Sequence, residues 1–502
     1  MITVNSKQKA LAQLDHRYLW HPFSQMRDWL RRAPIVIVDA SGAVLRDAAG
    51  REYLDANSSI WTNLHGHAHP KINAALRRQL NKIAHSSALG LASEPASLLA
   101  QKLIQSANLP GAASVLARQR VGLDACGGHR PQLQGASSVP AYRRLARVFF
   151  SDDGSTAMEV ALKLAFQFAL RTGRSRHPRF LCLDNAYHGD TVGAVSLGHI
   201  DLFHQSYAGL LFKTGKVMSP YCYRCPFNRA KPERADAREY RNCRWECVAT
   251  VERKFDARKK QGDPWAAFVF EPLIQGAAGM IPHPSGWLSR VAQIARGHGA
   301  QLIADEVMTA FGRATVSAPS LLACHQENVH PDFAALAKGL TGGYLPLAAT
   351  LTTSEVFSAF LGEYDEFKTF FHGHSFTGNQ LGAAAALASL EILESPASLA
   401  ARHTLARTLR EELLTLWPLP RVGDIRQVGL VAGVELVKDW KTREPFPLRE
   451  QAGIRVCAAM ARRGVLTRPV GNVIVLMPPY CATAVQAQTI VRVLRQSILE
   501  TL

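Results

Sequence analysis

The sequence predicts an α/β protein whose main domain holds a mostly parallel sheet, accompanied by a smaller α+β domain. Two observations support this fold class. From residue 147 onward, strand-like apolar runs such as RVFF and RFLCL alternate with helix-like segments such as TAMEVALKLAFQFAL, as in parallel sheets with crossover helices. The chain also has 502 residues, more than one simple domain needs.

The first and last segments show other patterns. Residues 35–55 contain three short apolar runs separated by a Ser-Gly and an Ala-Gly pair, which favours a β meander. Residues 70–84 carry apolar side chains at helical spacing. After Asn379, an alanine-rich helical stretch leads to strand candidates at 424–429, 431–437 and 472–479.

These patterns divide the chain into three expected parts. Residues 1–70 form the N-terminal part of the small domain, 71–378 the large domain, and 379–502 the C-terminal part of the small domain. Within the large domain, residues 111–143 are rich in Gly, Ala, Ser, Gln and Arg, and we expect an inserted loop there.

Composition narrows the class of protein. Hydrophobic residues make up 47% and charged residues 20%, which is ordinary for a globular protein, and no apolar run reaches 18 residues. The polar N-terminus shows no secretory signal, so we expect a cytoplasmic chain with no membrane partner. The net charge is +18, but Lys and Arg are spread along the chain without a basic tail. That spread argues against nucleic acid as a partner.

Four of the nine cysteines fall in one stretch, at Cys222, Cys225, Cys243 and Cys247. A C-x2-C…C-x3-C spacing can bind zinc or an iron–sulfur cluster. The second pair is not a C-x2-C knuckle, and the run between the pairs is strongly charged, which suits an exposed loop over about 219–248. We therefore predict reduced thiols without a metal, with metal binding as the alternative.

Polar residues follow several of the predicted strands. Asp153, His188, Glu271 and Asp305 each stand at or just after the end of an apolar run. Ligands of open α/β sheets bind at the carboxyl ends of the strands. These positions are therefore where a binding site is expected.

Gly154 and Ser155 follow a predicted strand and open a predicted helix. The first turn of a helix offers free backbone N–H groups and the positive end of the helix dipole, and a serine hydroxyl adds a further donor. A phosphate would be well held there. An ordinary helix cap is the alternative interpretation of the same residues.

Asp305 and Lys338 are the strongest candidates for chemistry. A carboxylate at the end of an apolar strand needs a cationic partner, which could be a protonated pyridine nitrogen or a nearby arginine such as Arg313. Lys338 lies between the apolar run FAALA and a glycine-rich turn, and a lysine with a lowered pKa can form a Schiff base. A surface lysine before a turn is the alternative.

Tyr187 and Arg468 are weaker candidates. Tyr187 follows the strand RFLCLD and could stack on a cofactor ring, although core aromatic residues are more common. Arg468, in LTRPVGN, could hold a carboxylate by two parallel hydrogen bonds, although a solvated surface arginine has the same pattern.

Together these motifs resemble a known family. SDDGSTAMEVALK, NAYHGDT, FEPLIQGAAGM, LIADEVMTAFGR, LAKGLTGGYLPLAAT and HGHSFTGN are similar to the landmarks of the class III (ω-type) aminotransferases, in the same order. The resemblance runs from about residue 15 to the C-terminus and skips the insert. It implies the fold-type I architecture with a seven-stranded central sheet, pyridoxal 5′-phosphate (PLP) as cofactor, and a homodimer.

Narrower motifs resemble one branch of that family. YLWHPFSQM, NSSIWTNLHGHAHP and LTRPVGNVIVLMPPY are similar to the enzymes of biotin biosynthesis that transfer an amino group to 8-amino-7-oxononanoate (KAPA). S-adenosylmethionine is their usual amino donor, and some use lysine. Where better-known members have tyrosine and a tryptophan pair, this chain has Phe23 and Ile60-Trp61. The resemblance therefore leaves lysine as an alternative donor.

The resemblance also implies a role for each matching residue. Lys338 would bind PLP as a Schiff base and carry the proton, Asp305 would pair with the pyridine nitrogen, and Tyr187 would stack on the ring. Gly154 and Ser155 would bind the phosphate, and His374 and Ser375 would reach the cofactor of the neighbouring subunit. The substrate site would comprise Phe23, Ile60, Trp61, Tyr187, Lys338, Gly373 and Arg468.

Two other functions are alternatives. Another class III aminotransferase, acting on a diamine or an ω-amino acid, would share most of these motifs, but Arg468 and Trp61 argue against it. A PLP-fold protein that has lost catalysis would not need both Lys338 and Asp305. We expect an active aminotransferase.

Overall fold

The structure is a computed structural model that describes residues 4–109, 143–316 and 320–502. Apart from its last position, the predicted insert at 111–143 lies outside the described residues. No helix in the described ranges is long and apolar enough to cross a membrane.

The large domain is built on a seven-stranded sheet with the order β4-β12-β11-β10-β7-β5-β6. Only β12 runs antiparallel to its neighbours, which confirms the predicted mostly parallel sheet. The strands are β4 (Leu145–Ser151), β5 (Phe180–Leu183), β6 (Gly215–Val217), β7 (Ala267–Phe270), β10 (Gln301–Asp305), β11 (Phe333–Leu336) and β12 (Ala348–Thr353).

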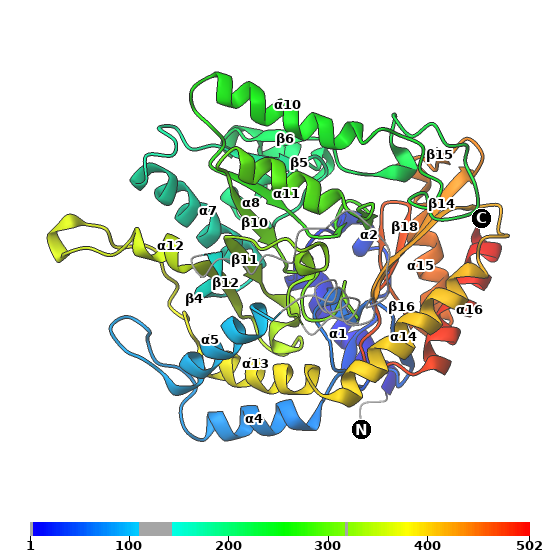
Figure 1. The fold of residues 1–502 in the computed structure, drawn as a ribbon. Coiled ribbons are helices and arrows are strands. Elements are labelled where there is room, and N and C mark those ends of the chain that lie inside the picture. The colour runs from blue at the N-terminus through cyan, green and yellow to red at the C-terminus, as the bar shows by residue number, and fades with distance from the viewer. Residues whose placement is uncertain (1–3, 110–142, 317–319) are drawn as a thin grey trace, which may run out of the picture.

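Helices cover both faces of this sheet (Figure 1). Alternate strand residues point to opposite faces, so neighbours such as Phe268 and Val269 belong to different apolar clusters. One face packs against α5 (Glu94–Ala107), α10 (Glu246–Lys260), α11 (Trp287–Gly297) and α13 (Gln380–Leu393). The other face packs against α7 (Gly154–Arg171) and α8 (Val192–Leu197), while the short helices α9 (Asp201–His204) and α12 (Ser354–Ser358) follow α8 and β12.

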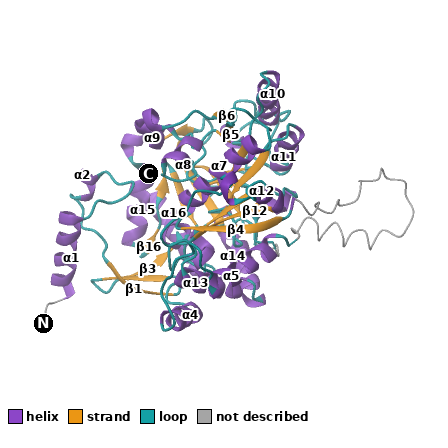
Figure 2. Ribbon diagram, turned by 90° about the vertical axis from the view of Figure 1, so that its left-hand side faces the viewer, coloured by secondary structure: helices purple, strands orange, loops and turns teal. Residues whose placement is uncertain are grey.

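The predicted N-terminal meander is confirmed as β1 (Ile37–Ser41), β2 (Val44–Asp47) and β3 (Glu52–Asp55). The predicted helix is α4 (Pro70–Leu80), which ends a few residues earlier than its apolar pattern. Before the meander come α1 (Val4–Tyr18) and α2 (Met26–Trp29), at the left-hand edge of Figure 2. The late strand β16 (Val465–Leu466) pairs with β3, so the two ends of the chain share a sheet.

The three predicted C-terminal strands are confirmed as β13 (Val422–Val428), β14 (Val431–Asp439) and β18 (Val473–Leu476). They form an antiparallel sheet extended by β15 (Glu444–Pro445) and β17 (Pro469–Val470). In Figure 1 this sheet lies at the right of the large domain, together with α14 (Pro396–Leu414), α15 (Ala452–Arg462) and α16 (Ala484–Thr501).

The cysteine-rich loop is less exposed than predicted. Cys222 and Cys247 are buried, and Tyr221 and Arg224 both bond to Glu435 of β14. Arg426 of β13, also buried, completes this network. The charged run at 231–242 was predicted to face solvent, and Lys231, Glu233 and Glu239 do so. Its middle packs against the small sheet instead, because Arg238 bonds to Asp236 and to the Gln427 carbonyl of β13. The described residues contain no group of three or more His, Cys, Asp or Glu arranged to hold a metal.

Candidate active site

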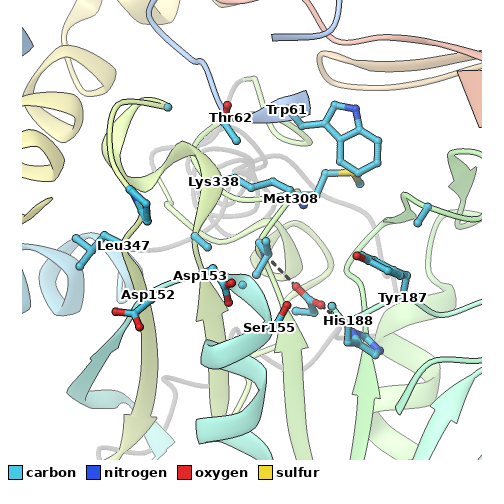
Figure 3. Close-up of a pocket in the computed structure, with 18 of the residues that line it drawn as sticks. Trp61, Thr62, Asp152, Asp153, Ser155, Tyr187, His188, Met308, Lys338 and Leu347 are labelled. Atoms are coloured by element: carbon cyan, nitrogen blue, oxygen red, sulfur yellow. Dashed lines mark hydrogen bonds and ion pairs between the residues drawn. The ribbon is translucent and has the colours of Figure 1, made fainter. Parts of the chain in front are cut away.

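A cavity of about 450 Å³ lies where the parallel strands of the large sheet end. Polar residues after β4, β5, β7, β10 and β11 meet there, as the sequence predicted for a sheet of this class. The volume falls in the range of small-ligand pockets. In Figure 3, Asp153 and Ser155 lie at the start of α7, with Lys338, Met308 and Trp61 above them. Six predicted site residues line this cavity: Trp61, Gly154, Ser155, Tyr187, Asp305 and Lys338.

The start of α7 has the free backbone N–H groups that an anion site needs. Asp153 caps the helix by accepting the N–H of Thr156 at 2.8 Å, whereas the N–H groups of Gly154 and Ser155 have no partner within the helix. A Cβ on Gly154 would lie 2.8 Å from Val307 Cγ1. A Cβ on Gly189 would lie 2.2 Å from Ser155 Oγ. Glycine at these two positions therefore lets the start of α7 pack closely against Val307 and against the backbone at Gly189.

Asp305 is held by His188 and by backbone. His188 Nδ1 lies 2.7 Å from Asp305 Oδ2, and the N–H of Val307 donates to Oδ1 at 3.1 Å. Both side chains are buried, and His188 Nε2 has no hydrogen-bond partner among the described residues. Arg313 is not the partner of Asp305, because its guanidinium donates to the carbonyls of Pro478 and Asn63. The alternative prediction, a salt bridge between Asp305 and Arg313, is therefore wrong.

Lys338 follows β11 and reaches into the cavity. Its φ of 45° is in the left-handed region, which is costly for a side-chain-bearing residue and common at functional sites. Burial lowers the pKa of its amine, while Asp305 and Glu271 act in the opposite sense. The lowered pKa favours the neutral, nucleophilic amine. The Nζ lies 5.0 Å from the centre of the Trp61 ring.

Glu271 is a second buried carboxylate of the cavity. It stands directly after β7 and accepts the N–H groups of Gly276 at 2.7 Å and Tyr187 at 3.4 Å. Burial is the main reason that its pKa is raised to about 7, and Asp305 adds to the effect. The site therefore holds two acids with different surroundings, a common feature of catalytic sites.

Tyr187 forms one wall. Its hydroxyl donates to Asp190 Oδ2 at 2.7 Å, and its ring stacks on His204 at 6.2 Å. Burial raises its pKa, so the hydroxyl keeps its proton. Phe23, which is 61% exposed, contacts Phe203, and Phe203 contacts Tyr187. Phe23 thus reaches this wall only through another ring.

Trp61 reaches the cavity from a left-handed helical turn. Ser58, Ser59, Ile60 and Trp61 all have positive φ, and this turn is the short helix α3 (Ser58–Trp61). Left-handed helical geometry costs roughly 1–2 kcal/mol per residue for L-amino acids. Strain of this kind is found where the surrounding structure imposes it, often at binding sites.

The other predicted residues lie outside the cavity lining. Ile60 is 46% exposed, and Arg468 is exposed with no ion pair among the described residues. Val470, in the strand β17 that directly follows Arg468, packs in one apolar cluster with Trp61 and Met308.

The segment from Gly373 to Ser375 is also peripheral. His374 Nδ1 lies 3.3 Å from Asp152, a cavity residue, and the Ser375 carbonyl accepts from His85 at 2.9 Å. Gly373 and Ser375 are exposed, so both are free to meet another molecule.

Sequence reasoning did not assign roles to several cavity residues. His188 and Glu271 were noted only as polar strand ends, and Met308 was missed. The signal for the first two was the position after a strand. Met308 carried none, since a methionine is an ordinary core residue.

Comparisons with known proteins agree with this geometry. The sequence profile described as "Aminotransferase class-III" matches residues 26–498. The chain belongs to the class III aminotransferases. It is therefore a transaminase whose cofactor is PLP, and the open helix start, the buried acid and the buried lysine fit that group.

Relatives cover nearly the whole chain. The adenosylmethionine-8-amino-7-oxononanoate aminotransferase of Geobacter sulfurreducens is 44% identical over 98% of this chain and 97% of its own length. The crystal structure of the enzyme of that name from Methanocaldococcus jannaschii is similar with a TM-score of 0.82 and 35% identity, covering 98% and 99% of the two chains. A PLP-bound amine transaminase from an uncultivated Pseudomonas species has a TM-score of 0.80 and 29% identity, covering 96% and 99%.

The raised pKa of Glu271 predicts how the free energy of unfolding depends on pH. Because its pKa rises from 4.5 to about 7 on folding, the folded chain binds more protons, and the free energy of unfolding falls as pH rises through that window. In the cofactor-free protein, Glu271→Gln removes this fall, which is about 3 kcal/mol for a shift of this size. Melting temperatures from pH 4.5 to 8 measure it.

The control is Glu411→Gln, at an exposed carboxylate with no ion pair among the described residues. We expect that control to follow the wild-type profile. A Glu271→Gln profile that also follows wild type contradicts the raised pKa.

Proposed function

We propose that this transaminase makes 7,8-diaminononanoate by transferring an amino group to KAPA, with S-adenosylmethionine as donor, in biotin biosynthesis. The observation that carries the proposal is the near-complete match to relatives named for this reaction, up to 44% identical over 98% of the chain. Structural neighbours named as ω-transaminases at 24% identity support the fold alone.

Arg468 supports the choice of KAPA, which carries a carboxylate far from its keto group. An exposed arginine with no ion pair among the described residues can bind that carboxylate by two parallel hydrogen bonds. The apolar cluster of Trp61, Met308 and Val470 lies between Arg468 and Lys338 in this proposal, and it suits the substrate's alkyl chain. Ile60 and Phe23 line the outer part of the same channel.

Around the cofactor, each residue has one task. When bound, PLP supplies an electrophilic carbon and an electron-accepting ring. Gly154 and Ser155 bind its phosphate. Tyr187 packs on its ring.

Asp305 binds the proton of the ring nitrogen, and His188 holds Asp305 in place at 2.7 Å. Lys338 Nζ attaches the cofactor and, once released, accepts the α-proton of the donor as a general base. The lowered pKa of Lys338 suits this task, because a neutral amine is the proton acceptor.

The enzyme in this proposal is a homodimer. Six large apolar side chains within residues 89–91 and 364–376 are more than half exposed, and monomers rarely leave so many uncovered. They are Leu89, Leu91, Tyr364, Phe367, Phe371 and Phe376. A second copy would cover them and receive His374 and Ser375 at its own cofactor.

The proposed location is the cytoplasm. All eight cysteines of the described residues are free thiols, as expected in a reducing compartment.

Replacement of Arg468 tests the carboxylate site. Arg468→Met should raise KM for KAPA about 10- to 100-fold, because a charged hydrogen bond contributes about 1.5–3 kcal/mol. The kcat should change little. Steady-state kinetics at saturating donor measure both, and Arg449→Met, at an exposed arginine of the same domain, is the control. Equal KM values for wild type and Arg468→Met would refute the assignment of Arg468 to the KAPA carboxylate.

The donor is tested by turnover of KAPA with S-adenosylmethionine and with lysine, side by side. Phe23 and Ile60 are the reason to include lysine, since they replace the residues of better-known members. We expect the higher kcat/KM with S-adenosylmethionine. A higher value with lysine reverses the donor assignment, and turnover with neither refutes the proposed reaction.

A further inference from the structure

The turn that carries Trp61 is left-handed over four consecutive residues. The φ values of Ser58, Ser59, Ile60 and Trp61 are 46°, 48°, 63° and 69°. Hydrogen bonds from Trp61 N to Asn57 O at 2.9 Å and from Thr62 N to Ser58 O at 3.0 Å close a full helical turn. None of the four is a glycine, and Ile60 is β-branched, so the local sequence does not favour this hand.

Asp55 holds the start of this turn. Its Oδ1 accepts the N–H groups of Asn57 at 3.2 Å and Ser59 at 3.1 Å. Its Oδ2 accepts the Ser59 hydroxyl at 2.9 Å and is 3.1 Å from His67 Nε2. Asp55 is only 3% exposed, and although burial acts to raise its pKa, the hydrogen bonds of His67 and Ser59 lower it. The carboxylate therefore stays charged and fully bonded.

Asp55 and His67 are themselves fixed by backbone pairing. Asp55 is the last residue of β3, where it pairs with Leu466 of β16, and its N–H donates to Ala43 O at 2.9 Å. His67 exchanges two backbone hydrogen bonds with Gly42, at 3.0 and 2.8 Å. The hydrogen bonds of Asp55 and His67 thus attach the turn to a sheet whose strands come from both ends of the chain.

The other end of the turn faces the cavity. Asn57 Oδ1 accepts the indole N–H of Trp61 at 2.8 Å, and the Ser58 hydroxyl donates to Met477 O at 2.6 Å. These bonds aim the indole at Lys338, with 5.0 Å between the Nζ and the ring centre. A right-handed turn would send successive side chains the other way round the axis and could not place the ring there.

We propose that Asp55, with His67, is a positioning residue of the active site, which imposes the left-handed turn and thereby holds the Trp61 ring over Lys338. Neither residue lines the cavity, so any effect on catalysis passes through Trp61. This inference rests on the proposed function for the choice of substrate.

A double-mutant cycle tests it. In the PLP-loaded enzyme, Asp55→Asn keeps the side-chain shape but turns one acceptor into a donor facing Ser59 or His67. We expect kcat/KM for KAPA to fall about 10- to 100-fold, as for other displaced positioning groups. In a Trp61→Ala background the same change should alter kcat/KM by no more than about twofold, since the ring on which it acts is gone.

A spectroscopic measurement that does not depend on turnover accompanies the double-mutant cycle. The near-ultraviolet circular dichroism difference between wild type and Trp61→Ala defines the signal of the ordered indole. Asp55→Asn should lose the same signal, with PLP bound and without it. Asp47→Asn is the matched control, because Asp47 is 1% exposed and bonds to the N–H groups of Ala49 and Arg51 in the neighbouring hairpin. It should lower the melting temperature and keep the indole signal.

The proposal is overturned if Asp55→Asn leaves kinetics and the indole signal unchanged, or if it lowers kcat/KM equally in both backgrounds. If Asp55→Asn does not fold, Ser59→Ala, which removes only the hydroxyl bond to Asp55, takes its place in the cycle. Failure of the proposed function is separate, because it appears as absent turnover of KAPA by the wild-type enzyme.

Discussion

The burial of the Lys338 amine beside two carboxylates is the constraint on which the rest of the site depends. Leaving water disfavours the ammonium form, while Asp305 and Glu271 favour it, and burial prevails. Asp305 can stay there because His188 and the Val307 N–H bond to it. The parallel sheet makes this possible, since it brings the ends of β5, β7, β10 and β11 to one edge and covers both faces with helices.

Much of this arrangement could be predicted from the sequence. A polar residue at the end of an apolar strand is a local sequence signal for a binding site. Lys338, Asp305 and Ser155 all stand at such positions. The pairing of Asp305 with His188 could not be predicted, because 117 residues separate them and either could have had another partner. The left-handed turn could not be predicted either. Nothing in SSIW favours positive φ, and the bonds that impose it come from Asp55 and His67, which look like ordinary strand and loop residues.

Most residues assigned by resemblance alone lie further out, with the exception of Trp61, which lines the cavity. Phe23 reaches Tyr187 only through Phe203, and Gly373 to Ser375 stand at the exposed edge of the chain. A single subunit therefore holds Lys338 and the two buried acids beside it, whereas in our proposal His374 and Ser375 reach the cofactor of a second copy. Burial explains the difference in predictability, since the fold of one chain fixes the inner residues, whereas in our proposal a second copy is needed to fix the outer ones.

Borohydride treatment of the PLP-loaded protein tests the central claim most directly, because it converts the bond between cofactor and lysine into a stable secondary amine. After proteolysis, mass spectrometry should find the pyridoxyl group on the peptide that contains Lys338. Lys338→Ala, treated in the same way, should retain no label. A label on another lysine, or equal labelling of wild type and Lys338→Ala, would contradict the account.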